Sequence, residues 1–166
     1  MRVWVTLLTA TVAVTLWNGV YSAQADSLSA QDRQFMEEAA TGGMMEVHLG
    51  HLAVERGMSQ AVKNFGQRMV TDHGKGSNEL KALAKQKGVS LPAEEPKMAA
   101  STRLAKLSGA DFDKAYARDM VEDHQKDIAA FEKEAASGSD PDVKSWASKT
   151  LPTLRSHLTE AQALPK

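Results

Sequence analysis

The sequence has 166 residues, a formal net charge of −1 at pH 7 and no cysteine. Its basic residues are interspersed with acids, so the chain lacks the basic patch that a nucleic-acid partner requires. The lack of cysteine excludes disulfides, thiolate catalysis and cysteine-based zinc or iron–sulfur sites. Histidine, aspartate and glutamate therefore remain as the strong metal ligands.

The first 25 residues predict an export signal. Arg2 is a short basic start, an apolar run extends to Trp17, and Ala23-Gln24-Ala25 is a small-x-small cleavage site. The run is shorter than the ~20 residues that a bilayer span needs, so we predict cleavage after Ala25 and no retained anchor. We therefore expect a secretion signal at 1–25, one domain at 26–166, and a periplasmic or outer-membrane-associated location.

Apolar residues then recur at the 3.6-residue spacing of an α-helix. The first such pattern begins after Ser27-Leu28-Ser29 and continues to about Arg56. Gly42-Gly43 lies inside it, and we interpret this pair as a close helix crossing or a kink. The second pattern runs from Met58 towards Lys87, and Gly88 ends it.

Two prolines prevent 89–96 from being one helix, which predicts a linker there, with room for a short helix over 97–106. Further helices are predicted over 108–138 and 140–164, each with a capping residue at its start. Pro152 lies inside the last one and should kink or split it. No stretch has a useful strand pattern, so the predicted fold is all-α, most simply a four-helix bundle.

Two near-copies of one motif, Met69-Val70-Thr71-Asp72-His73 and Met120-Val121-Glu122-Asp123-His124, place an acid and an imidazole inside apolar helical patterns. Glu46, His73 and His124 each fall near the midpoint of a long predicted helix. Midpoints of packed helices meet at one level, so these three side chains can converge whichever way the helices run. His157 lies past the middle of the last helix and fits this level less well.

The motif aspartates lie beside the histidine stripes, because neighbouring residues point ~100° apart on a helix. An aspartate that accepts the ring N–H of a histidine on another helix would support a metal ligand. The same pairing could equally complete a polar layer without metal. The candidate ligands, for a transition metal such as iron, manganese or zinc, are Glu46, Asp72, His73, Asp123, His124 and His157.

Other patterns favour plainer interpretations. Asp119 and Asp127 share a face of the third long helix with Asp123, and we interpret them as solvent-exposed. The methionines follow helical spacing, which favours core packing over a copper site. The sequence contains no Gly-x-Ser-x-Gly motif and no glycine-rich phosphate loop, so nothing indicates nucleophilic catalysis.

The twin motifs, together with Gly42-Gly43-Met44-Met45-Glu46-Val47 and Leu151-Pro152-Thr153-Leu154-Arg155-Ser156-His157-Leu158, resemble the domain-of-unknown-function family 4142. The resemblance covers nearly the whole chain after the signal. It implies a ferritin-like four-helix bundle exported to the bacterial envelope, with no established activity. Ferritin-like di-iron proteins carry Glu-x-x-His motifs, and this sequence contains none.

The leading hypothesis is therefore a non-enzymatic, exported helical bundle whose polar middle layer binds a transition metal. One alternative is a ferritin-like oxidase or peroxidase with two metal ions. Another is an envelope module that binds a protein partner without metal, which would show as an exposed apolar patch.

Overall fold

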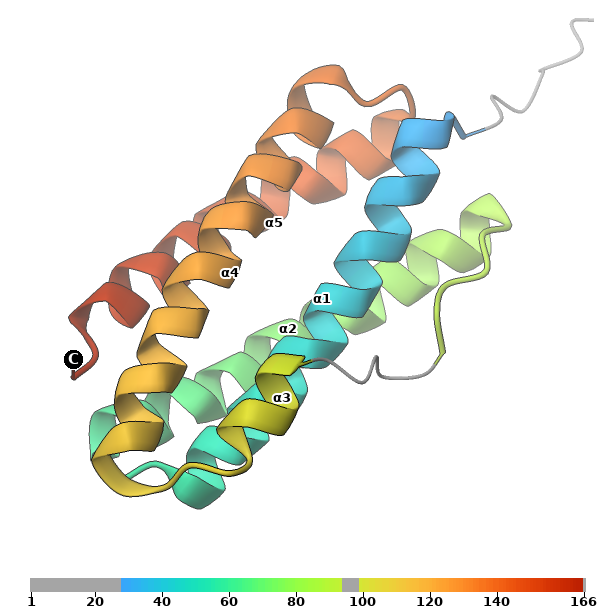
Figure 1. Ribbon diagram of the computed structural model, residues 1–166. Coiled ribbons are helices and arrows are strands. Elements are labelled where there is room, and N and C mark those ends of the chain that lie inside the picture. The colour runs from blue at the N-terminus through green and yellow to red at the C-terminus, as the bar shows by residue number, and fades with distance from the viewer. Residues whose placement is uncertain (1–27, 94–98, 166) are drawn as a thin grey trace, which may run out of the picture.

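The computed structural model describes residues 28–93 and 99–165, and the predicted export signal lies outside them. These residues form five helices and no strand, which confirms the all-α prediction (Figure 1). Four helices are long and correspond to the four predicted ones, and the fifth is the short helix for which the linker had room. They are α1 (Ala30–Arg56), α2 (Gln60–Lys87), α3 (Ala99–Leu104), α4 (Gly109–Ser137) and α5 (Pro141–Ala163).

Local side-chain chemistry sets the helix ends. Ser29 and Asp32 form a capping box at the start of α1, and Asp140 accepts two backbone amides at the start of α5. Gly88 adopts a φ of 67° after the last residue of α2, a left-handed conformation that glycine tolerates. Asp32 also accepts the Ser139 amide at 2.8 Å, which ties the start of α1 to the turn between α4 and α5.

Pro152 does not split the last helix, because α5 continues through it. Proline deprives the carbonyl four residues earlier, that of Ser148, of its helical partner. Both residues are exposed, so water can satisfy that carbonyl. None of the described helices is long and apolar enough to cross a membrane.

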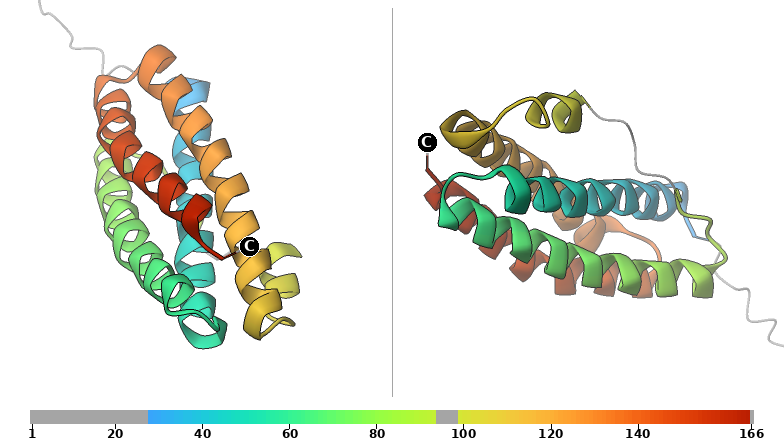
Figure 2. Two further views of the ribbon diagram at one scale, coloured as in Figure 1. Left: turned by 90° about the vertical axis from the view of Figure 1, so that its left-hand side faces the viewer. Right: turned by 90° about the horizontal axis from the view of Figure 1, so that it is seen from below.

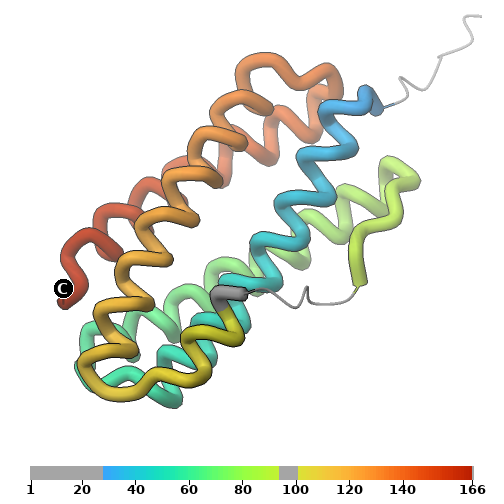
Figure 3. The backbone as a smooth tube through the Cα atoms, in the orientation of Figure 1, coloured from blue at the N-terminus to red at the C-terminus, as the bar shows by residue number. Residues whose placement is uncertain are grey.

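The long helices form two antiparallel pairs, α1 with α2 and α4 with α5 (Figures 1 and 3). Packing is densest within each pair, and the pairs join where α1 lies on α4 and α2 on α5. The short α3 contacts α1 and α4, away from the other two helices (Figure 2).

Two apolar clusters fill the interior, one towards each end of the long helices. The first contains Leu49, Phe112 and Tyr116, and the second contains Phe35 and Leu154. Four of the six methionines in the described residues are buried in these clusters, as predicted, whereas Met58 is 69% exposed. A layer of polar side chains lies between the clusters, at the level of Glu46 and the motif histidines.

Glycines set the distance between α1 and α2. A Cβ atom added to Gly50 would lie 2.6 Å from the carbonyl oxygen of Gly66, and one added to Gly66 would lie 2.7 Å from the Gly50 carbonyl oxygen. Only glycine permits so close an approach of two backbones. We interpreted Gly42-Gly43 as a close crossing or a kink, but α1 continues through both glycines, and they border a cavity next to the polar layer.

Candidate metal centre

Three histidines meet in the polar layer, His73 from α2, His124 from α4 and His157 from α5. Each offers one ring nitrogen such that all three nitrogens lie within 4.8 Å of one another. His124 and His157 are fully buried, and His73 is nearly so. Within residues 28–93 and 99–165 this is the one group of three or more potential ligands that could share an ion.

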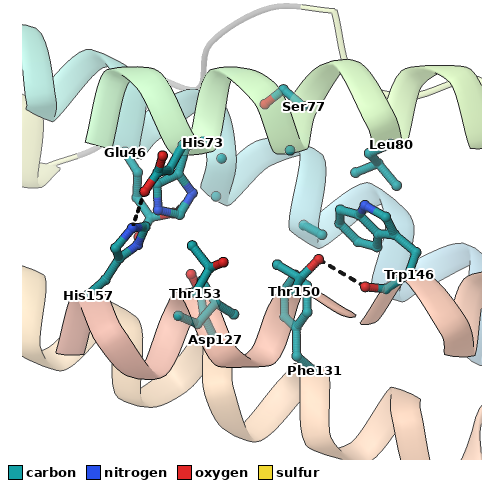
Figure 4. Close-up of a pocket in the computed structure, with 16 residues that line it drawn as sticks. Glu46, His73, Ser77, Leu80, Asp127, Phe131, Trp146, Thr150, Thr153 and His157 are labelled. Atoms are coloured by element: carbon teal, nitrogen blue, oxygen red, sulfur yellow. Dashed lines mark hydrogen bonds and ion pairs between the residues drawn. The ribbon is translucent and has the colours of Figure 1, made fainter. Parts of the chain in front are cut away.

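Glu46, on α1, pairs closely with one of the three rings and lies beside a second. Its Oε2 lies 2.8 Å from His73 Nδ1, and its Oε1 lies 3.4 Å from His124 Nδ1 (Figure 4 shows Glu46 and His73). The same nitrogen of His124 also lies 2.9 Å from the Met120 carbonyl oxygen. A carbonyl can only accept a hydrogen bond, so Nδ1 of His124 carries the proton and Nε2 carries the lone pair.

Asp72 holds the third ring across the bundle. Its Oδ2 lies 2.9 Å from His157 Nε2, and Arg68, one turn earlier on α2, donates to the same oxygen at 3.1 Å. This confirms the predicted pairing between a motif aspartate and a histidine of another helix. The expectation that His157 fits the level less well is wrong. It stands as far from the start of α5 as Glu46 does from the start of α1, and both helices start at the same end.

The other nitrogen of each ring has no partner. His73 Nε2, His124 Nε2 and His157 Nδ1 are buried without a hydrogen bond, and so is Glu46 Oε1. Leaving a buried polar atom unpaired costs about 1–3 kcal/mol, so three such nitrogens in one layer need an explanation. Three imidazole nitrogens are a donor set that suits zinc and copper.

Electrostatics divide the histidines into two kinds. Burial lowers the pKa of His124, and it lowers that of His157 to about 4 although Asp72 opposes the shift. For His73 burial also disfavours the charge, but the Glu46 carboxylate outweighs it and raises the pKa. Burial likewise disfavours the Glu46 charge, yet the facing histidines lower the pKa of Glu46. His124 and His157 are therefore neutral donors at pH 7, whereas His73 keeps its second proton to a higher pH, and a metal would compete with that proton.

A cavity of about 50 Å³ borders the histidine layer on one side (Figure 4). That volume admits a few water molecules. His73, His157 and Glu46 lie at its polar end, and Phe131 and Trp146 lie at its apolar end. A metal held by the histidines would therefore face a small, partly apolar space.

Asp123 lies apart from the histidine group, although it is one of the predicted ligands. It lines an open groove between α1 and α4. Burial, followed by the negative charge of Glu46, raises the pKa of Asp123 to about 6. Asp123 thus lies on the groove side of Glu46, whereas His73 and His157 lie on its cavity side.

Asp127 was missed by the sequence analysis, which assigned it and Asp119 to a solvent-exposed face. Asp127 is half-buried and lines both the groove and the cavity. Its carboxyl pKa is raised to about 8, first by burial and then by the charge of Glu46. The three-residue spacing from His124 was the available signal, because such positions share a helix face. Asp119 is buried as well and pairs with Arg103.

Several solved structures share this fold. A DUF305 fragment from Deinococcus radiodurans aligns with a TM-score of 0.71 at 17% identity, covering 82% of this chain and 95% of that one. A secreted DUF305 protein from Streptomyces coelicolor aligns at 0.70 and 11%, covering 80% and 90%. CopM in its Cu(I)-bound form aligns at 0.68 and 15%, covering 80% and 93%. At these identities the likeness shows the fold alone.

No curated protein sequence matches this chain. One family model does, and it covers residues 20–164, which include all four long helices and every residue of the histidine layer. This agrees with the resemblance of the twin motifs. The chain belongs to the family described as "Domain of unknown function (DUF4142)".

Proposed function

We propose that this protein is an exported helical bundle that binds one transition-metal ion through His73, His124 and His157. The observation that carries the proposal is the meeting of three buried histidines, each of which keeps one ring nitrogen without a hydrogen bond. The predicted signal at 1–25 supports export to the periplasm or outer membrane, with 26–166 as a single domain. A ferritin-like bundle is part of the proposal, because each of the four long helices contributes one residue to the layer.

A polar layer without metal explains the geometry less well. Such a layer would pair its buried polar atoms with one another. Here Glu46 and Asp72 occupy one nitrogen of His73 and His157, and the opposite nitrogen is left free. Carboxylates that hold histidine rings in this way are the usual support of metal ligands.

Zinc, copper and iron fit the site better than manganese. Imidazole suits all three, whereas manganese prefers oxygen ligands. Glu46 and Asp72 are engaged in holding rings, which leaves nitrogen as the main donor. The copper- and silver-bound structures of CopM, which shares the fold, support copper as a candidate.

The two alternatives have less support. A di-metal oxidase or peroxidase needs ligands for two ions ~3.5–4 Å apart, but the described residues bring together a single group of three histidines. A partner-binding module needs an exposed apolar patch. The large hydrophobic residues exposed in the described chain are Val54 and Met58, at the end of α1 and just beyond it.

Metal titration tests the proposal. The chain from residue 26 onward, stripped of metal, is titrated with Zn(II) and, under reducing conditions, with Cu(I), and bound metal is measured by elemental analysis. We expect one ion per chain, and none in the His73→Ala, His124→Ala double variant. His51→Ala is the control, since His51 is exposed on α1. The proposal fails if the double variant retains as much metal as the control, with helical content verified by circular dichroism.

A further inference from the structure

The groove between α1 and α4 has a strongly acidic lining. Its volume is about 500 Å³, ten times that of the cavity next to the histidines. Five carboxylates border it against a single lysine. They are Glu37, Glu38, Glu46, Asp123 and Asp127, and the lysine is Lys126.

Glu46 and Asp127 connect this groove to the histidine layer. Both side chains line the groove on one side and the cavity on the other. Glu46 is only 3% exposed, and its Oε1 is buried without a hydrogen bond. Gly42 lines both spaces too, and a Cβ atom there would stand 3.9 Å from Asp127 Oδ1. Glu46, whose Oε1 accepts no hydrogen bond, thus lies where the two spaces meet.

The groove acids do not form a second metal site of their own. In the part of the chain that the structure describes, the histidines are the one group whose ligand atoms lie close enough to share an ion. The carboxylates are instead distributed from the surface inward, from Glu38 through Asp123 to Glu46. A series of acids that runs from the surface inward suits the transfer of a cation more than its retention.

We propose that this acidic groove is the route by which a metal cation enters the three-histidine site, with Asp127 and Glu46 as the last acidic side chains before the rings. The inference rests on the proposed function, because it needs a metal site at the inner end. Clefts of one charge raise the local concentration and the association rate of the opposite charge, by 10- to 1,000-fold.

Trp146 provides the assay. It is the only tryptophan after the predicted signal, and it lines the cavity that the histidines border. Cu(II) quenches tryptophan fluorescence, so stopped-flow mixing with Cu(II) reports loading. The test variant carries Glu37→Gln, Glu38→Gln and Asp123→Asn, none of which contacts a ring. The matched control carries Glu55→Gln, Glu79→Gln and Glu132→Gln, exposed acids that do not border the groove.

At low salt we expect the test variant to load about tenfold more slowly than the wild type, and the control to stay within about twofold. Lys126→Gln should load faster than the wild type. The differences should shrink at about 0.5 M salt, where exposed charges are screened. Equal loading rates in the two triple variants, with one Cu(II) still bound per chain, overturn the route alone. A wild-type chain that binds neither Cu(II) nor Zn(II) overturns the metal site and the route together.

Discussion

Replacing Gly50 with alanine should weaken both the fold and the metal site. A Cβ atom at this position would lie 2.6 Å from the Gly66 carbonyl oxygen and 3.1 Å from Met69 Cβ. A backbone oxygen cannot rotate away, so α1 and α2 would have to separate by about 0.8 Å to reach an ordinary contact distance. A gap of 0.5–1 Å already forfeits about a quarter to a half of each contact energy.

The expected loss of stability is about 2 kcal/mol. Overpacking costs typically 1–3 kcal/mol, and here it acts on the helix pair with the closest backbone approach. The gain of up to ~1 kcal/mol that alanine normally brings to a helix offsets part of that cost. Glu46 lies one turn before Gly50 on the same face, so the separation also lengthens its 2.8 Å contact with His73. We therefore expect metal affinity to fall about tenfold, as when a residue that supports a metal ligand is lost.

Urea unfolding followed by circular dichroism measures the first effect, and a competition titration with a chromogenic chelator measures the second. Gly74→Ala is the matched control, because a Cβ atom at Gly74 on α2 would meet nothing within 4 Å. The unfolding free energy of that variant should rise by up to ~1 kcal/mol, and its metal affinity should stay unchanged. If Gly50→Ala proves as stable as Gly74→Ala, the close crossing does not set the helix spacing.

Three further predictions concern Asp72, His157 and Asp32. Asp72→Asn should weaken metal binding by about 10- to 100-fold, because Asp72 supports the His157 ring. The same competition titration measures the affinity, and an unchanged value would mean that Asp72 does not hold this ring. Because the pKa of His157 is lowered to about 4 in the folded state, its contribution to stability is complete above about pH 6.5 and is lost as the pH falls towards 4. Urea titrations across that range should therefore show that the wild type loses up to about 3 kcal/mol of unfolding free energy relative to His157→Gln. The same pH dependence in both proteins would contradict this prediction. Burial disfavours the Asp32 charge, but the bonds from Ser29 and Ser139 outweigh it and lower the pKa to about 2. Asp32→Asn should then cost about 2 kcal/mol at pH 7, and the cost should vanish as the pH falls from about 4 through 2; a constant cost would exclude the charge as its cause.

Local chemistry allowed the sequence to predict the helices. Ser29, Gly88 and Asp140 act on the backbone within a few residues of themselves, so their effect is visible without knowledge of the fold. The convergence of His73 and His124 was also predictable, because midpoints of long helices coincide at any orientation.

The remaining features of the site depend on how helices face one another. The level of His157 follows from which end α5 starts at, and the exposure of Asp127 follows from the position of α1 beside α4. The crossing at Gly50 and Gly66 likewise needs both helices to be placed. Sequence spacing along a single helix carries none of this information.

The division of the bundle into two helix pairs gives the histidine layer a mechanical role. Glu46 and His73 belong to the first pair, and His124 and His157 belong to the second, while packing between the pairs is sparser than within them. An ion shared by the three rings would link the two helix pairs to each other, where the packing is sparser. Removal of the metal by a chelator should therefore let the α1–α2 pair separate from the α4–α5 pair before either pair unfolds. The metal supply would then determine how long the two pairs stay packed together.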